Sequence, residues 1–229
     1  MSFRILPRML GRLRRALAQA EEAAERSLQS VTDNPVYLPP SSEHPDGRVL
    51  SNGGFHNTMA PAALDELAAI QADLCTLADR QTAKILSGPV SRLPDQLRTE
   101  SEDPRYLGCL PMTQVGFGEA ARRAAQRTFL PGSESGGFGQ NDVATNSVTA
   151  WRSQAEAGRM LEAALAPLAL AASQALHVTQ RAAPPALAGR LAGVRAAAPV
   201  LEPDMRPLGP EAAELAERLR IEIFNGSPS

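Results

Sequence analysis

The sequence has few residues of the kinds that build disulfide scaffolds, metal sites or nucleic-acid interfaces. Two cysteines, Cys75 and Cys109, stand far apart in 229 residues, which excludes a disulfide-rich scaffold and indicates reduced thiols. The three histidines lack the spacing of metal ligands, so we expect no metal site. A formal net charge of −2 excludes the basic excess with which proteins bind nucleic acid.

Aromatic residues are also scarce, at 4% of the chain. Strands draw on aromatic and β-branched residues, whereas alanine and leucine supply most of the apolar mass here. Hydrophobic residues make up 43% and charged residues 21%, within the range of folded domains. The composition therefore predicts an all-α protein with a buried core and excludes wholesale disorder.

No run of apolar residues is long and uncharged enough to predict a membrane segment. The most apolar stretch, 160–178, contains Glu162, Pro167 and Gln174. The arginine-rich start leaves a targeting peptide open as an alternative, but acidic residues follow at 21–25 on the same helical pattern. We expect a cytoplasmic protein with no membrane partner.

Hydrophobic periodicity predicts four long helices and two short ones. The first has a single apolar stripe and ends before Pro35; the stripe consists of Leu6, Leu10, Leu13, Leu17, Ala20, Ala24 and Leu28. The second begins near Pro61, the third covers 111–128, and the fourth covers 142–178 with a possible kink at Pro167. Two short helices are predicted at about 185–197 and 210–224.

These helices are predicted to pack as a long-helix bundle over residues 1–180, with irregular loops at 35–60 and 129–141. Residues 181–229 are predicted to form short helices that pack on the bundle. No alternating pattern predicts a strand or a hairpin. Helices this long in so small a chain usually bury apolar stripes against other subunits, so we expect an oligomer.

Three polar clusters lie at predicted helix ends or in glycine-rich loops: Arg4, then Asn34 with Phe55 and His56, then 140–142. Each has a purely structural interpretation. Arg4 could be a solvated charge, Asn34 could end a helix, and residue 141 or 142 could cap the fourth helix. Spacing alone defines no reaction, because the chain shows no Ser-His-Asp arrangement, phosphate loop or carboxylate pair.

Read in order, these clusters resemble motifs of the aromatic amino acid ammonia-lyases. Residues 30–35, SVTDNP, look like the family's VTDNP segment, and 51–56, SNGGFH, are similar to its SGGNFH loop. Residues 139–143, GQNDV, resemble its NQED or NQDV segment, and 2–7, SFRILP, resemble the end of its QDxYSxRxxP stretch. Weaker matches at 77–80, 93–94 and 206–210 extend the resemblance over nearly the whole chain.

The resemblance implies a particular chemistry. Family members use a methylidene-imidazolone electrophile, made by cyclisation of an Ala-Ser-Gly tripeptide, and a tyrosine base that removes a β-proton before ammonia leaves. Their sites are built from more than one chain of a helical tetramer. Carried over by position, the resemblance implies that Arg4 pairs with the substrate carboxylate, that Asn34 forms a hydrogen bond near the carboxylate and the electrophile, and that Phe55 packs against the substrate or the electrophile. Gln140 and Asn141 line the amine and side-chain end.

The departures from the family pattern are as informative as the matches. The 229 residues contain no Ala-Ser-Gly, the loop with the tyrosine base is absent, and the tyrosine upstream of Arg4 has no counterpart. Gly54 replaces the asparagine of SGGNFH, and an asparagine stands two positions earlier, at Asn52. Asn141 stands where histidine-type members have glutamate and phenylalanine-type members have glutamine, so the substrate does not carry over.

Two functional hypotheses follow. In the first, the chain is the C-terminal half of a split ammonia-lyase or aminomutase for an aromatic or histidine-like amino acid. A separately encoded N-terminal half carrying Ala-Ser-Gly then completes a tetramer-like hetero-oligomer, and supplies both the electrophile and the base. A start immediately before Arg4 keeps the first helix whole, as such a split requires. In the second, favoured by Gly54 and Asn141, the chain is a non-catalytic scaffold or regulatory subunit derived from the same fold.

Overall fold

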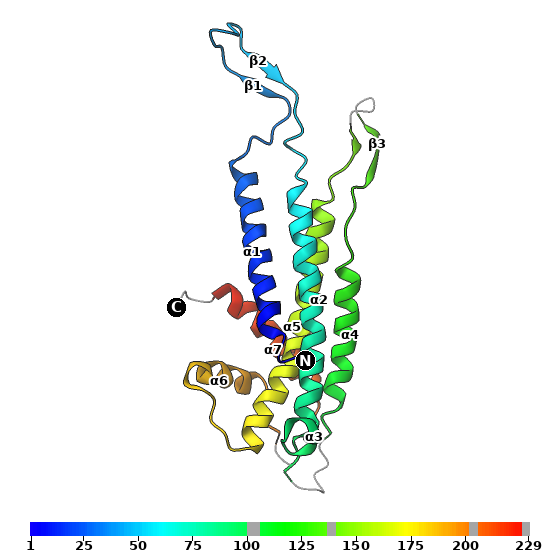
Figure 1. Ribbon diagram of the computed structural model, residues 1–229, viewed down its shortest axis with the longest axis vertical. Helices are drawn as coiled ribbons and strands as arrows, with labels where there is room; N and C mark the ends of the chain where they lie inside the picture. The colour runs from blue at the N-terminus through cyan, green and yellow to red at the C-terminus, as the bar shows by residue number, and fades with distance from the viewer. Residues whose placement is uncertain (100–105, 137–140, 202–205, 226–229) are drawn as a thin grey trace.

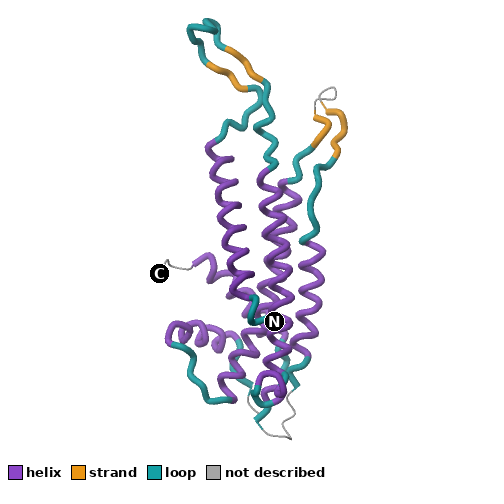
Figure 2. The backbone as a smooth tube through the Cα atoms, in the orientation of Figure 1, coloured by secondary structure: helices purple, strands orange, loops and turns teal. Residues whose placement is uncertain are grey.

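The computed structural model describes residues 1–99, 106–136, 141–201 and 206–225, with side chains throughout these ranges except at 133–136, 141 and 222–225. Four long α-helices run side by side: α1 (Leu6–Gln29), α2 (Met59–Leu86), α4 (Cys109–Ala124) and α5 (Ser147–Val178). Figures 1 and 2 show them forming an elongated bundle, with loops and short strands projecting beyond one end. The predicted all-α bundle is confirmed.

Short turns and two further helices complete the part of the molecule that the structure describes. A single turn, α3 (Gly88–Ser91), and a 3-10 turn, η1 (Asp95–Leu97), lead from α2 toward α4. After α5 come a 3-10 turn, η2 (Pro185–Leu187), and the helices α6 (Ala188–Ala197) and α7 (Gly209–Asn225). Both α6 and α7 contact α5. The C-terminal segment therefore lies against the side of the bundle rather than extending it (Figure 1).

Alanine explains how closely the central helices approach. Ala78 of α2, Ala121 of α4 and Ala164 of α5 are all buried in one cluster with Cys75. A methyl group is the smallest side chain that still excludes water without the entropic cost of glycine, so three helix backbones can meet here. A second cluster, in which Ile70 is fully buried, joins α1 to α2.

One side of α1 packs on α2 and the other remains exposed. Arg12 fastens the packed side, because its Nε contacts Glu66 at 2.8 Å and its Nη1 contacts Asp73 at 3.0 Å. Leu10 and Leu17 belong to the same apolar stripe but lie at its edge, and each is 44% exposed. The apolar stripe predicted from the sequence is therefore wider than the face that α2 covers, as expected if another chain packs there.

Pro167 lies inside α5, where it cannot donate the backbone hydrogen bond of a helical residue. A carbonyl oxygen in the turn of α5 before Pro167 accepts a hydrogen bond from a side chain of α4. Gln114 of α4 is fully buried, and its Nε2 donates a 2.7 Å hydrogen bond to the Ala164 carbonyl oxygen. A polar side chain in the core thus joins α4 to the proline-containing turn of α5.

The prediction that the chain contains no strands is wrong. Strands β1 (Val36–Leu38) and β2 (Arg48–Leu50) form one antiparallel hairpin, and β3 (Gly132–Gly136) and β4 (Asn141–Val143) form another. Each strand has only three to five residues, too few for an alternating pattern to be visible in the sequence. Both hairpins project from the same end of the bundle (Figure 2).

Pairing of β4 also changes where the fourth helix begins. The sequence predicts a start at Asp142, but that residue is paired in β4 and α5 begins at Ser147 with Asn146 as the N-cap residue. The third helix is likewise shorter than predicted, ending at Ala124 rather than near 128. Residues assigned to helix therefore belong to the turn after α4 and to β4 with the segment that follows it.

By length and composition α5 is apolar enough to cross a membrane, with a mean hydropathy of 1.3 over 18 residues. That composition has a structural explanation within the bundle. α5 contacts α2 and α4 on one side and α6 and α7 on the other, so it is the central helix. Central helices are apolar around most of their circumference in folded proteins.

Candidate functional site

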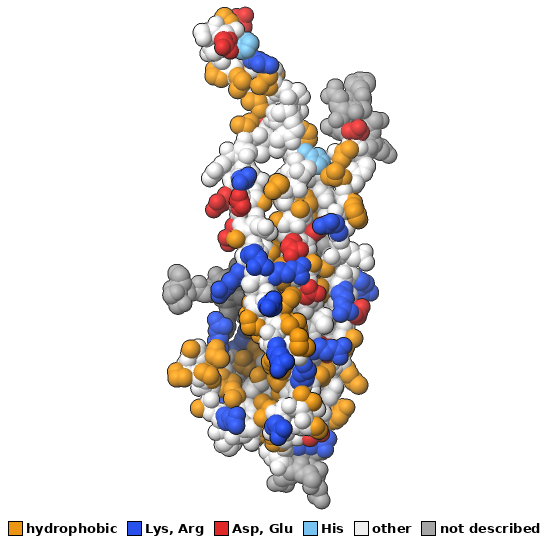
Figure 3. Space-filling model, viewed as in Figure 1, with side chains coloured by type: hydrophobic (Ala, Val, Ile, Leu, Met, Phe, Trp, Pro, Cys, Tyr) orange, Lys and Arg blue, Asp and Glu red, His pale blue; other side chains and the backbone are white. Residues whose placement is uncertain are grey.

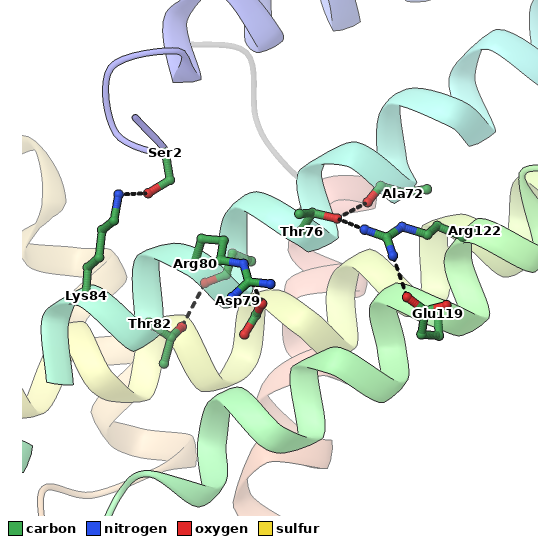
Figure 4. A network of polar contacts seen from close by, with 10 residues as sticks. Ser2, Ala72, Thr76, Asp79, Arg80, Thr82, Lys84, Glu119 and Arg122 are labelled. Atoms are coloured by element: carbon green, nitrogen blue, oxygen red, sulfur yellow. Dashed lines mark hydrogen bonds and ion pairs between the residues drawn. The ribbon is translucent and has the colours of Figure 1, made fainter. Parts of the chain in front are cut away.

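Arg4 lies in a turn that precedes α1 and is fastened to the C-terminal part of α2. The backbone N–H of Arg4 donates to the Met1 carbonyl oxygen at 2.8 Å. Ser2 is buried in this turn: its carbonyl oxygen accepts a 3.1 Å hydrogen bond from Gln81 Nε2, and its Oγ accepts one of 3.0 Å from Lys84 Nζ (Figure 4). Because Gln81 and Lys84 both belong to α2, they fix the position of the turn that carries Arg4.

The Arg4 side chain is exposed, and within the described ranges no carboxylate forms an ion pair with it. Its surroundings are basic. Lys and Arg side chains gather over the first half of α1 and the second half of α2 (Figure 3), whereas nearby Asp79 is buried and lies 3.4 Å from Arg80 (Figure 4). A guanidinium in this setting is available to an anion from solvent or from another chain.

At the opposite end of α1, Asn34 holds together two loop segments that are distant in sequence. Its Oδ1 accepts a 2.8 Å hydrogen bond from the backbone N–H of Asn52 and a 3.3 Å bond from Ser51 Oγ. The side chain of Asn52 returns a bond, because its Nδ2 donates to the Asp33 carbonyl oxygen at 2.9 Å. The VTDNP-like and SGGNFH-like segments therefore form one structural unit.

The same unit determines the position of Phe55. Asn52 Oδ1 accepts a 2.7 Å hydrogen bond from Gly54 N–H, and a Cβ atom on Gly54 would lie only 2.6 Å from the Val31 carbonyl oxygen. Only glycine allows the loop to approach Val31 so closely. Phe55 follows with its side chain 52% exposed, and its ring meets that of His56 edge to face at 6.5 Å.

His56 belongs to the second polar cluster of the sequence, but the resemblance to the ammonia-lyases assigned it no role. Its Nε2 atom is buried and has no hydrogen-bond partner in the part of the chain that the structure describes. Buried polar atoms are normally paired, and the neighbouring exposed Phe55 ring makes this atom a candidate for contact with a ligand or another chain. The Gly-Phe-His order of the loop was the signal available in the sequence.

Asn57 joins this loop to the helices. Its Nδ2 donates to Ser27 Oγ at 2.5 Å, and its carbonyl oxygen accepts a 3.3 Å bond from Ser147 Oγ. The end of α1 and the starts of α2 and α5 therefore meet here, beneath both hairpins (Figure 1). Asn141 lies in β4 opposite Gly136, at this same end of the bundle. Gln140 lies outside the described residues.

A cavity of about 550 Å³ opens at this end, between the first turns of α2 and the segment that follows α4. Its polar wall consists of Asp65, Thr128 and Asn146. Asp65 accepts hydrogen bonds from Thr128 N–H at 2.9 Å and from the Thr128 hydroxyl, which in turn accepts one of 3.0 Å from Asn146 Nδ2. Hydrogen bonds among these three residues hold the polar wall of the cavity together. None of the three belongs to a motif that the sequence analysis identified.

The structure therefore separates the predicted site residues into two groups. Asn34, Phe55 and Asn141 belong to the hairpin end, whereas Arg4 lies at the far end of α1. A 24-residue helix lies between Arg4 and Asn34, and at 1.5 Å per residue it spans about 36 Å. An amino acid is far shorter than this distance, so Arg4 and Asn34 of one copy do not meet on the same substrate.

Known proteins match most of the length of this chain. A family model described as aromatic amino acid lyase matches residues 1–198. The chain belongs to the aromatic amino acid lyase family. Histidine ammonia-lyase from Streptomyces coelicolor is 34% identical over 201 residues, which cover 86% of this chain and 37% of that enzyme. Its counterpart from Streptomyces avermitilis is 38% identical over 125 residues, 54% of this chain and 23% of the relative.

Solved structures show the same ammonia-lyase fold. Histidine ammonia-lyase from Trypanosoma cruzi superposes with a TM-score of 0.84 at 19% identity, over 97% of this chain and 43% of that one. Tyrosine aminomutase from Streptomyces globisporus gives 0.82 at 22% identity, over 98% and 42%. The lyase-family chain therefore spans less than half the length of these relatives.

Proposed function

We propose that this lyase-family chain supplies substrate-binding walls for an ammonia-lyase or aminomutase site, while another polypeptide supplies the methylidene-imidazolone electrophile and the base. The substrate is an aromatic or histidine-like amino acid. The 229 residues contain no Ala-Ser-Gly, and this supports an electrophile that comes from another polypeptide. The observation that carries the proposal is Arg4, which is exposed and forms no ion pair with any carboxylate in the described part of the chain, although two residues of α2 hold the turn that carries it.

That arrangement suits a carboxylate ligand better than a solvated surface charge. A purely solvated arginine needs no fixed backbone, whereas a guanidinium that forms two parallel hydrogen bonds to a carboxylate must be positioned before the ligand arrives. At the other end, the hydrogen-bonded loop around Asn34 presents Phe55 to solvent as an apolar surface for a substrate side chain. Beside it, the buried Nε2 of His56 has no hydrogen-bond partner among the residues that the structure describes.

The separation of about 36 Å along α1 adds a requirement to the proposal. If Arg4 and Asn34 both contact substrate, they contact different substrate molecules, and each site combines residues from two copies of this chain. In a symmetric assembly every copy then contributes Arg4 to one site and the Asn34 loop to another. The exposed Leu10 and Leu17 on α1 lie between the two ends and suit such a contact.

A second candidate function is a scaffold subunit that assembles with a lyase without contributing to catalysis. Gly54 favours it, because the close approach to Val31 leaves no room for the family's asparagine at that position. Asn141 favours it too, since it lacks the carboxylate of histidine-type members. Under this hypothesis, the chain still assembles with its partner, but substitution of Arg4 has no effect on turnover.

The test uses the chain together with an N-terminal half that carries Ala-Ser-Gly, encoded in a neighbouring reading frame. Ammonia release from histidine, phenylalanine and tyrosine, and conversion to β-amino acids, are measured for each half and for the mixture. We expect no turnover from this chain alone and turnover from the complex. Arg4→Ala should raise KM by about 10- to 100-fold without loss of assembly, whereas the control Arg8→Ala, one turn further along α1, should not.

Mixed assemblies then separate the two candidate functions. Arg4→Ala and Asn34→Ala copies are each expected to give defective complexes. When the two variants are mixed, about a quarter of the sites should receive both intact residues if they come from different copies. Recovery of that activity supports the proposal. If the mixed complexes assemble but recover no activity, the proposal that each site combines residues from two copies is wrong. Full turnover in both single variants favours the scaffold.

A further inference from the structure

A separate groove lies on the side of the bundle, and none of the proposed site residues lines it. It has a volume of about 640 Å³ and runs between α4, α5 and α7. Its walls are mainly apolar: Leu110 and Phe117 come from α4, Pro167 comes from α5, and small residues such as Ala212 and Ala216 come from α7. Cavities of this size and composition are typical of small-molecule sites, which combine apolar walls with a few polar groups.

The arginines that line the groove form ion pairs, whereas one glutamate that lines it forms none with the residues that the structure describes. Three arginines line it, and each already has a carboxylate partner: Arg159 pairs with Glu156 at 2.5 Å, Arg206 pairs with Glu211 at 2.6 Å, and Arg220 pairs with Glu217.

Glu162 of α5 also lines the groove, and it forms no ion pair or hydrogen bond with any residue that the structure describes. It is only partly exposed. Its burial raises the pKa of its carboxyl group despite the proximity of Arg220 and Arg159. A partly buried carboxylate without a partner is electrostatically unfavourable, so the groove lacks one positive charge.

Two aromatic rings border the same space. Phe117 projects from α4 and is partly buried, and Tyr106 precedes α4. A Cβ atom on Gly108 would lie 2.5 Å from Tyr106 Cζ, so glycine at this position allows the Tyr106 ring to lie against the first turn of α4. Aromatic faces attract organic cations and also pack against apolar groups.

We propose that this groove binds a small organic cation, namely a protonated amine with an apolar body, whose ammonium group pairs with Glu162 while its body lies between Phe117 and the alanine-rich face of α7. Charge distinguishes this ligand from others. A neutral apolar molecule leaves the Glu162 carboxylate unpaired, and an anion meets arginines that already have partners. The inference does not depend on the proposed lyase function.

The native cysteines provide a direct measure of occupancy. Cys109 lines the groove and is exposed, whereas Cys75 is fully buried in the core. The rate at which iodoacetamide alkylates Cys109 is measured with 2-phenylethylamine, with the neutral analogue 2-phenylethanol and with the anion phenylacetate. We expect the amine to slow alkylation and to raise the melting temperature. The alcohol should need about tenfold higher concentrations than the amine for the same effects, and the anion should need higher concentrations than the alcohol.

Three variants make the assignment specific. Glu162→Gln should weaken amine binding about tenfold while leaving the alcohol unchanged, and Ala213→Trp should fill the groove and abolish protection by both. Glu214→Gln removes the same charge from α7 outside the groove and should bind the amine normally. Equal binding of amine and alcohol, or normal amine binding by Glu162→Gln, overturns the proposal. So does Cys109 protection that rises with protein concentration alone, which identifies a second copy as the occupant.

Discussion

Gly54 lies so close to Val31 that a Cβ atom at position 54 would approach the Val31 carbonyl oxygen to 2.6 Å. The same atom would lie 2.9 Å from Asn52 Oδ1, which is already bonded to Gly54 N–H. Gly54→Ala should therefore force the two loop segments apart and cost about 1–2 kcal/mol, the usual range for overpacking. Hydrogen exchange over residues 31–57 should accelerate, and the melting temperature should fall.

Gly53 provides the matched control, because a Cβ atom there meets no other atom within 4 Å. Gly53→Ala should leave both hydrogen exchange and the melting temperature nearly unchanged. Equal effects of the two substitutions would show that loss of glycine flexibility, rather than the contact with Val31, is responsible.

The turn that precedes α1 and contains Ser2 and Arg4 gives a second prediction, which concerns how Arg4 is positioned. Gln81 is buried, and its bond to the Ser2 carbonyl oxygen joins α2 to the turn before α1. Gln81→Ala should release this turn, so that the amides of residues 4 and 5 exchange faster, with a global cost of about 1–3 kcal/mol for the broken buried hydrogen bond. Hydrogen exchange followed by mass spectrometry measures both effects.

Gln154→Ala is the control for this experiment. Gln154 also bonds to α2, through Gln71 at 3.3 Å, but lies on the N-terminal half of α5. Its substitution should lower stability slightly without accelerating exchange at Arg4. If the amide of Arg4 still exchanges slowly in Gln81→Ala, the bond from Lys84 to Ser2 is enough to hold the turn before α1.

The long helices could be predicted from the sequence because their apolar residues recur over many turns. The stripe from Leu6 to Leu28 indicated α1 nearly to the residue. Family motifs then indicated Arg4, Asn34 and Phe55, which no periodicity could single out. The hairpins could not be predicted, since Val36–Leu38 and Asn141–Val143 are each three residues long and their pairing depends on contacts across a loop.

Other features depend on geometry that a sequence does not contain. Gln81 and Lys84 look like ordinary polar residues on a long helix, and only the fold shows that they hold Ser2. Likewise, the motif order suggests one site, whereas the length of α1 places Arg4 and Asn34 at opposite ends. The order of motifs along the sequence therefore does not give the distance between their residues in the fold.

The two cysteines give a third prediction, on reactivity. Burial raises the pKa of the Cys75 thiol to about 12, and the side chain is fully enclosed between α2, α4 and α5. Cys109 is exposed at the start of α4. Because the thiolate is the reactive form, native protein at pH 8 should incorporate one alkyl group, at Cys109. Peptide mass spectrometry locates the label, and rapid labelling of Cys75 without denaturant would contradict the packing described for the core.

Glu162 gives a prediction on the pH dependence of stability. Burial raises the pKa of this carboxyl group from its ordinary value of 4.5, and Glu217 raises it further, whereas Arg220 and Arg159 lower it. Well below 4.5 the group is neutral in the folded and unfolded states alike, so it costs nothing. As the pH rises through the raised folded-state pKa, the folded protein acquires a charge that the unfolded chain solvates better, and stability is lost.

Glu162→Gln should therefore melt higher than the wild-type protein at pH 7, and the difference should disappear as the pH falls below 4.5. The side chain is partly exposed, so we expect a gain of about 1–2 °C, given that 1 kcal/mol corresponds to roughly 2–4 °C in a protein of this size. Glu214→Gln, which breaks an exposed pair with Arg218, should instead leave the melting temperature unchanged or slightly lower at pH 7. A Glu162→Gln variant that melts lower than wild type at pH 7 would mean that Arg159 or Arg220 already neutralises the carboxylate, and the groove would then have no missing charge.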